Sequence, residues 1–179
     1  MTKYIENQEF FHIQRETNGL TVPLWTIGET HFIGHKKNRY VEYFDYYDAR
    51  FHEGDATSLS SALFHTAKII RELIFEEVRK EFFPSHPSRQ RCLWVINQEN
   101  TDSLEYWRNE LGAVDKILKL RLTGKIHVAN QTFLGATTEN LNKIRQNAFH
   151  YWTGTNEGHN RELEILFEGF ATVIEEIRP

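Results

Sequence analysis

The stretch Arg161-Glu162-Leu163-Glu164-Ile165-Leu166-Phe167-Glu168-Gly169-Phe170-Ala171-Thr172-Val173 carries the pattern around which the rest of the chain is organised. Side chains alternate between the two faces of a strand, so one face would carry Leu163, Ile165 and Phe167. The opposite face would carry Glu162, Glu164, Leu166 and Glu168. Two carboxylates held this close repel each other and titrate as a coupled pair. Spacing alone favours a solvated edge face, because charged edge strands are common.

The composition of the chain bounds what it can be. Its 179 residues suffice for one domain with a sizeable core, so we expect a single domain over residues 1–179. A net charge of −4 gives no overall attraction to nucleic acid or to anionic membranes. The single cysteine, Cys92, excludes a disulfide framework and a cysteine-based zinc site. The sequence contains no run that predicts a bilayer span or a signal peptide, so we expect a cytoplasmic protein without a membrane partner.

Helical spacing of apolar residues predicts a long helix from about Asp55 to Phe82, begun by N-capping residues and stopped by Pro84. Its charged residues are most simply a solvated face: Arg71, Glu72, Glu76, Glu77, Arg79, Lys80 and Glu81. Thr101 and Asp102 should cap a second helix and Thr138 a third, with Gly154 as the C-cap of the third.

Strands are predicted at residues 10–15, at residues 92–97, and at residues 118–122. The Thr123-Gly124-Lys125 segment reads as a turn, after which residues 126–128 resume extended structure. Together with residues 161–173, these segments alternate with helices, and the sequence therefore predicts an α+β protein.

Residues 161–173 resemble the last conserved block of the ADP-ribosyltransferases. That block reads E-x-E, then apolar residues, a glycine and a strand that ends in valine. Gly169 and Val173 stand near the family spacing, one residue tighter here. The resemblance implies that Glu164 is the catalytic glutamate and that Glu162 is the first acidic residue of the block.

The beginning of the chain is similar to that of small ADP-ribosyltransferases of the rifampicin-modifying kind. A first strand with a histidine is followed by residues 24–34, with Gly28 and Gly34, and by a downstream asparagine, Asn38. The resemblance implies that His12 binds NAD through hydrogen bonds. Arg15 is a rival for this role, because another branch of the superfamily uses an arginine on this strand. A lone histidine between apolar residues is otherwise a half-buried core residue.

The second motif departs from the family pattern. The strand at residues 92–97 has neither the tyrosine nor the serine that the two branches of the family carry there. Trp94 could place a ring against nicotinamide, or it could simply pack in the core. Ser88 and Arg89, in the preceding loop, could supply hydrogen bonds to the cofactor.

The resemblance implies a fold of two small packed β-sheets that form an NAD cleft, flanked by helices. It implies NAD-dependent ADP-ribosyl transfer to an acceptor that the sequence does not identify, whether protein, nucleic acid or small molecule. Glu164 would stabilise positive charge on the ribose, and Glu162 would orient or deprotonate the incoming nucleophile. An antitoxin or inhibitor protein is a further partner consistent with this family.

Other chemistries remain open at this point. One alternative is a degenerate transferase fold that serves as a binding module. Another is an NAD glycohydrolase or a toxin-type enzyme that acts on nucleic acid, with a local basic patch of Lys36, Lys37, Arg39, Arg89 and Arg91. The Glu162 and Glu164 pair could also serve as the acid and base of a glycosidase. We expect no metal, because the sequence has no His-x-x-x-His pair flanking a glutamate.

Overall fold

The computed structural model describes residues 2–14, 24–46, 55–112, 114, 116–135, 140–154 and 162–177. The elements, in chain order, are β1 (Thr2–Gln14), β2 (Thr30–Ile33), α1 (Arg39–Tyr46), α2 (Ala56–Phe82), β3 (Leu93–Asn97), α3 (Thr101–Leu111), β4 (Lys116–Asn130), the 3-10 helix η1 (Gln131–Leu134), α4 (Leu141–Thr153) and β5 (Leu163–Ile177). The predicted α+β class is confirmed. None of the helices described is both long and apolar enough to cross a membrane.

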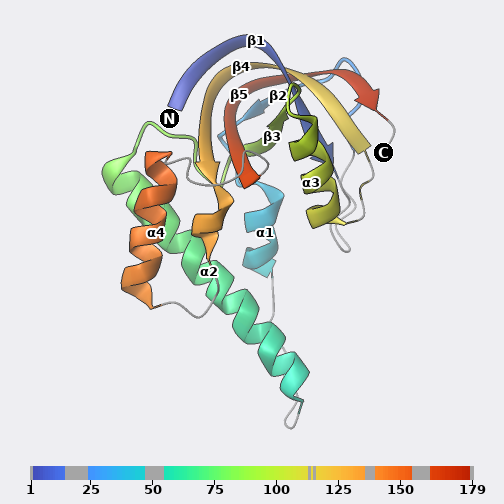
Figure 1. The fold of residues 1–179 in the computed structure, drawn as a ribbon. Coiled ribbons are helices and arrows are strands. Elements are labelled where there is room, and N and C mark those ends of the chain that lie inside the picture. Colours follow the sequence, from blue (N-terminus) through green and yellow to red (C-terminus); the bar gives the residue numbers. More distant parts are fainter. Residues whose placement is uncertain are drawn as a thin grey trace.

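The strands form one antiparallel sheet in the order β2-β5-β3-β1-β4, and a further pairing of β4 with β5 closes it. We expected two small sheets; the described residues instead form a single sheet that returns on itself. In Figure 1 the long strands β1, β4 and β5 curve together over the helices, and α2 and α4 lie side by side beneath them. The closed sheet therefore has an inside and an outside.

Strand β4 runs without interruption through Gly124, so the predicted turn at residues 123–125 is wrong. Gly124 stands opposite Gly169 of β5, and both have positive φ values, of 158° and 143°. A Cβ on Gly124 would lie 2.2 Å from the Glu168 carbonyl oxygen, and one on Gly169 would lie 2.4 Å from that of Thr123. The two glycines are needed because the backbones of β4 and β5 approach too closely here for side chains.

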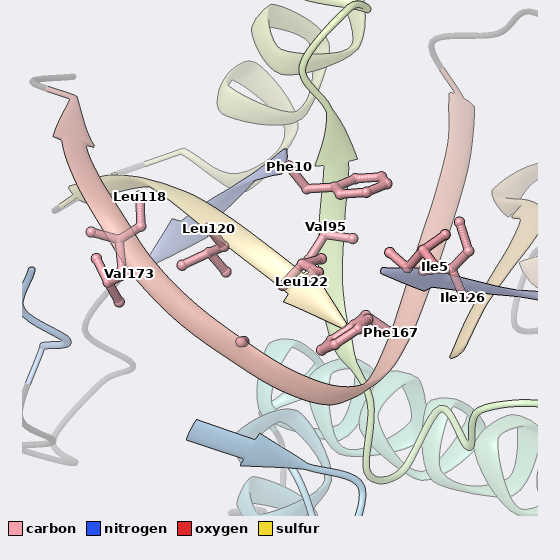
Figure 2. Packing of buried hydrophobic residues seen from close by; sticks show 10 residues of the cluster. Ile5, Phe10, Val95, Leu118, Leu120, Leu122, Ile126, Phe167 and Val173 are labelled. Carbon is pink, nitrogen blue, oxygen red and sulfur yellow. The ribbon is translucent and has the colours of Figure 1, made fainter. Parts of the chain in front are cut away.

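The inside of the sheet is an apolar core. Its buried residues are Ile5, Phe10, Val95, Leu118, Leu120, Leu122, Ile126, Phe167, Ala171 and Val173. Figure 2 shows that they point toward one another from β1, β3, β4 and β5. Ile165 packs against this cluster beside Phe167, so the predicted apolar face of residues 163–167 is confirmed for these two. The alternation of β4 and β5 thus fills the inside of the sheet.

A second core lies between the outside of the sheet and the helices α2 and α4. It contains Ile74, Phe75, Val78, Cys92, Ala129, Ala148, Tyr151, Trp152 and Leu166. Leu166 and Glu164 occupy the face of β5 that we expected to be solvated, and both are buried. The two faces of β5 are therefore covered by two different cores, and Glu164 belongs to the side of the helices.

Local signals place several helix ends correctly. The Asp55 side chain caps α2 by accepting from the backbone N–H groups of Thr57 and Ser58, and the helix ends at Phe82, before Pro84. Gly154 ends α4 in the left-handed conformation, with φ of 72°.

Two predicted N-caps differ from the structure. The cap of α3 is Asn100 rather than Thr101, and its side chain accepts from the Ser103 N–H. The cap of α4 is Asn140, which accepts from the Lys143 N–H, while Thr138 lies outside the described residues. Asparagine is as good an N-cap as threonine or better, which explains both shifts.

Candidate functional site

Glu164 lies at the beginning of β5 and faces the helical layer. Its side chain is 9% exposed. One carboxylate oxygen, Oε2, accepts hydrogen bonds from Arg89 Nη1 and from the Tyr151 hydroxyl, the latter at 2.7 Å. The other oxygen, Oε1, has no hydrogen-bond partner among the described residues. The carboxylate is thus fixed through one oxygen while the other remains able to accept.

Arg89 is the cation at the centre of the site. It lies in the loop between α2 and β3, where Asn38 Nδ2 donates to its carbonyl oxygen at 2.7 Å. Its guanidinium donates from Nη1 to the Tyr151 hydroxyl at 2.6 Å and from Nε to Glu72 Oε2 at 2.9 Å. Burial alone would lower the pKa of Arg89, but Glu164 and Glu72 raise it well above its usual value. Arg89 therefore remains charged between two carboxylates.

Glu72 of α2 completes the charge balance. Arg71 Nη2 donates to Glu72 Oε1 at 2.9 Å, and Arg71 also reaches the Leu134 carbonyl oxygen and the Tyr40 hydroxyl. Burial opposes ionisation of Glu72, yet Arg89 and Arg71 bring its pKa below the usual value. We call Glu164, Tyr151, Arg89, Glu72 and Arg71 the Glu164 network. Two anions and two cations are matched within it, and they are mostly shielded from water.

Aromatic rings surround Arg89. Its guanidinium lies over the ring of Tyr151 at 5.1 Å and over that of Trp94 at 5.6 Å. Tyr40 meets Trp94 edge-on, with 5.9 Å between the ring centroids. Trp94 is half-buried, and its Nε1 has no hydrogen-bond partner in the described part of the chain. An unpaired buried N–H is unusual and can accommodate an acceptor from a ligand.

His12 lies on the other face of the sheet. His12 is two residues after Phe10 in β1 and so faces the same side of the strand, the inside of the sheet. Its ring centroid lies 5.7 Å from that of Trp25. Its Nδ1 donates to the Trp94 carbonyl oxygen at 2.9 Å, just beyond the last β1–β3 pair, Phe11 with Ile96. Burial lowers the pKa of His12 to about 4, a shift that the Trp94 hydrogen bond partly offsets. The imidazole is therefore neutral near pH 7.

The structure distributes the other predicted site residues differently. Ser88 is buried, and its hydroxyl donates to Glu76 Oε2 at 2.9 Å, in a second cluster that also contains Arg79. Glu162 is half-buried and directly precedes β5. Arg15 lies outside the described residues. The structure thus brings Trp94 and Glu164 together around Arg89, whereas it places Ser88 in a different cluster and His12 across the sheet.

Three features bear on the alternative chemistries. Among the residues that the structure describes, no three histidine, cysteine or acidic side chains form a group able to hold a metal ion. Burial raises the pKa of the Cys92 thiol well above its usual value, which disfavours a reactive thiolate. Arg89 is 3% exposed, so it cannot contribute to the basic surface patch considered for nucleic acid.

Sequence reasoning missed the burial of two acidic residues of α2. Glu72 and Glu76 were expected on a solvated face of the helix, but they are 3% and 5% exposed. Their spacing of four residues aligns them with the half-buried Ile69, and this alignment was the available signal. Tyr151 of α4 is fully buried, and nothing in its local sequence indicated that its hydroxyl would meet Glu164.

The family model described as "Protein of unknown function (DUF2441)" matches residues 10–179. No curated protein matches the chain. The match covers every element from β2 onward and the second part of β1.

Proposed function

The chain belongs to the DUF2441 family, and from the geometry of its own site we propose that it is an NAD-dependent ADP-ribosyltransferase. It would cleave the bond between nicotinamide and ribose in NAD and transfer ADP-ribose to an acceptor still to be identified. One observation carries the proposal. Glu164, the residue that matches the catalytic glutamate of the resemblance, is a buried carboxylate with one oxygen fixed and the other without a hydrogen-bond partner among the described residues.

The reaction suits such a carboxylate. The bond between ribose C1′ and the nicotinamide nitrogen breaks, and its electron pair leaves with neutral nicotinamide. Positive charge then develops on the ribose. A preorganised anion stabilises this charge most strongly in a site that is shielded from water. Glu164 Oε1 would accept from the ribose 2′-hydroxyl, while Arg89 and Tyr151 hold Oε2. The acceptor's nucleophile then bonds to C1′ and releases its proton.

Other residues have supporting roles in this proposal. Glu162 would orient the nucleophile or take up its proton, since it is less buried than Glu164. Trp94 would offer its ring and its unpaired Nε1 to the cofactor. His12 faces the inside of the sheet, away from Glu164, so its hydrogen bond to the Trp94 carbonyl oxygen would position Trp94 rather than hold the cofactor. The closed sheet would then be a variant of the ADP-ribosyltransferase fold, and the enzyme would act in the cytoplasm.

A second candidate is a binding module that has lost catalysis. The observation in its favour is the ion pair of Glu164 with Arg89, because a carboxylate already neutralised by a guanidinium stabilises a new positive charge less strongly. The absence of tyrosine and serine from β3 points the same way. This candidate predicts weak NAD binding at most, and no nicotinamide release.

Nicotinamide release from NAD by the purified protein tests the proposal. Release that requires added cell lysate would indicate a transferase, and mass spectrometry of the lysate would identify the modified acceptor. Release without lysate would indicate hydrolysis or self-modification. If neither condition gives release above that of heat-denatured protein, the transferase is excluded, and titration calorimetry with NAD then tests the binding module.

A further inference from the structure

The long helix α2 has an exposed apolar stripe along one side. The stripe consists of Leu59, Leu63, Thr66, Ile70 and Leu73, whose separations alternate between four and three residues. This is the spacing that keeps side chains on one face of a helix and that two paired helices share at their contact. Leu59, Leu63, Ile70 and Leu73 are 48%, 61%, 39% and 58% exposed. Four large apolar side chains in register are unusual on a free helix surface.

Other side chains in the C-terminal half of α2 already have partners in the fold. Ile74, Phe75 and Val78 pack in the core that also contains residues of α4. Arg71 and Glu72 face the Glu164 network. Figure 1 shows the C-terminal half of α2 beside α4, while its N-terminal half extends away from the strands. The four large apolar side chains of the stripe therefore remain exposed in the folded chain.

The stripe is also poor in charge. Residues 56–67 contain no Lys, Arg, Asp or Glu, and Lys68 is the first charged residue of the helix. A helix side that faces water normally carries charges, whereas the centre of a protein interface is depleted of them. The first three turns of α2 therefore have the composition of an interface.

We propose that the stripe pairs with the same stripe of a second copy of the chain, with the two α2 helices antiparallel. A two-fold axis near Thr66 and Ala67 would set Leu63 against Ile70 of the second copy and Leu59 against its Leu73. Every large apolar side chain of the stripe then has an apolar counterpart. A two-fold interface must be complementary to itself in this way.

The charge of Glu77 and the position of the sheet and α4 both favour antiparallel over parallel pairing of the helices. Glu77 continues the stripe toward the C-terminus, is exposed and lies 4.0 Å from Arg145 of α4. Parallel helices would set these two charged side chains against the same two of the other copy. Antiparallel helices set Glu77 near the uncharged first turn of the other helix instead. The sheet and α4 lie at the C-terminal half of α2, so antiparallel pairing also places the two bodies at opposite ends.

The available area sets the strength of the contact. Taking about 200 Å² for a large apolar residue, the four residues expose about 400 Å² per copy, or about 800 Å² for both copies, which is below the range of stable specific interfaces and fits a weak contact. The dimer is therefore expected to dissociate at micromolar concentrations. Association of this kind is independent of NAD and of the Glu164 network.

Sedimentation velocity of the full chain, from about 1 to about 300 μM on the scale of such weak contacts, tests the proposal. Wild type should shift from monomer to dimer, and Leu63→Glu and Ile70→Lys should each remain monomeric.

The variant that combines both substitutions should dimerise more strongly than either single variant, because the carboxylate introduced at position 63 then meets the ammonium group introduced at position 70 of the other copy. Parallel pairing would not give this rescue. Phe170→Glu, which changes an exposed apolar residue of β5, is the control and should behave as wild type. A wild type that stays monomeric, or a double variant that does not recover, would overturn the proposal.

Discussion

The inside of the closed sheet and the layer between the sheet and α2 are both buried, yet they are built from different groups. The inside holds an apolar cluster with the neutral His12 beside it, whereas the helical layer adds Glu164, Arg89 and Glu72 to its apolar core. Apolar packing stabilises by removing area from water. A buried ion pair is weak evidence for stability, because desolvation offsets the attraction between the charges. The difference indicates that the inside of the sheet stabilises the fold, whereas the buried charges of the helical layer have a role other than stability.

The largest expected effect comes from breaking the charge balance. Arg89→Met leaves Glu72 with only Arg71 and Glu164 with no cation, and should lower the free energy of unfolding by about 3–5 kcal/mol. Leu120→Ala, in the fully buried inside of the sheet, is the matched apolar change and should cost about 3–5 kcal/mol through its cavity. Urea unfolding monitored by circular dichroism measures both. A stable Arg89→Met protein would show that Arg89 does not compensate these carboxylates.

Removing all three charged groups together should separate charge from packing. The triple variant Glu72→Leu, Arg89→Met and Glu164→Leu leaves no uncompensated carboxylate, and should recover about 3 kcal/mol relative to Arg89→Met. The same urea experiment measures this recovery. If the triple variant is less stable than Arg89→Met alone, the network itself stabilises the fold. That result would contradict the proposed difference between the inside of the sheet and the helical layer.

Lowering the pH should reduce the free energy of unfolding by a smaller amount. His127 is fully buried, accepts from the Thr2 hydroxyl at 3.1 Å and lies 4.4 Å from His86 between ring centroids. Burial lowers its pKa to about 3, so the folded state keeps it neutral. The unfolded chain binds this proton below about pH 6.5, and stability is therefore lost as the pH falls from there toward 3.

Replacement of His127 tests this linkage. Between pH 6 and pH 4, the slope of unfolding free energy against pH should be smaller in His127→Gln than in wild type, by up to about 1.4 kcal/mol per pH unit. The slope is compared rather than the stability itself, since the substitution also changes packing. Equal slopes would mean that His127 binds its proton equally well in both states.

Sequence signals that act locally predicted much of the fold. Asp55, the apolar spacing up to Phe82 and Pro84 defined α2 correctly, because capping and helix termination depend on neighbouring residues. The alternation around Ile165 and Phe167 predicted the inside of the sheet for the same reason. The caps of α3 and α4 shifted by a residue or more, because polar residues that can cap stand side by side there.

Features that depend on distant partners could not be predicted. The continuity of β4 through Gly124 requires Gly169 on the facing strand, so a turn was the natural interpretation of Gly124 alone. The burial of Glu72 depends on Arg89, which a loop brings to it from 17 residues further along the chain. The candidate site was predicted at Glu164 and Trp94, while the groups that hold Glu164 became visible only in three dimensions.

The central claim is that the charge of Glu164 serves chemistry and is dispensable for the fold. Glu164→Gln can still accept from Arg89 and Tyr151, so the protein should remain folded, and Glu175→Gln, an exposed change on the same strand, is the control. The deciding measurement is nicotinamide release by Glu164→Gln in samples whose folding is verified by thermal unfolding. The account predicts a loss on the order of 100-fold or more, with Glu175→Gln unchanged. A folded Glu164→Gln protein that releases nicotinamide at the wild-type rate would contradict it.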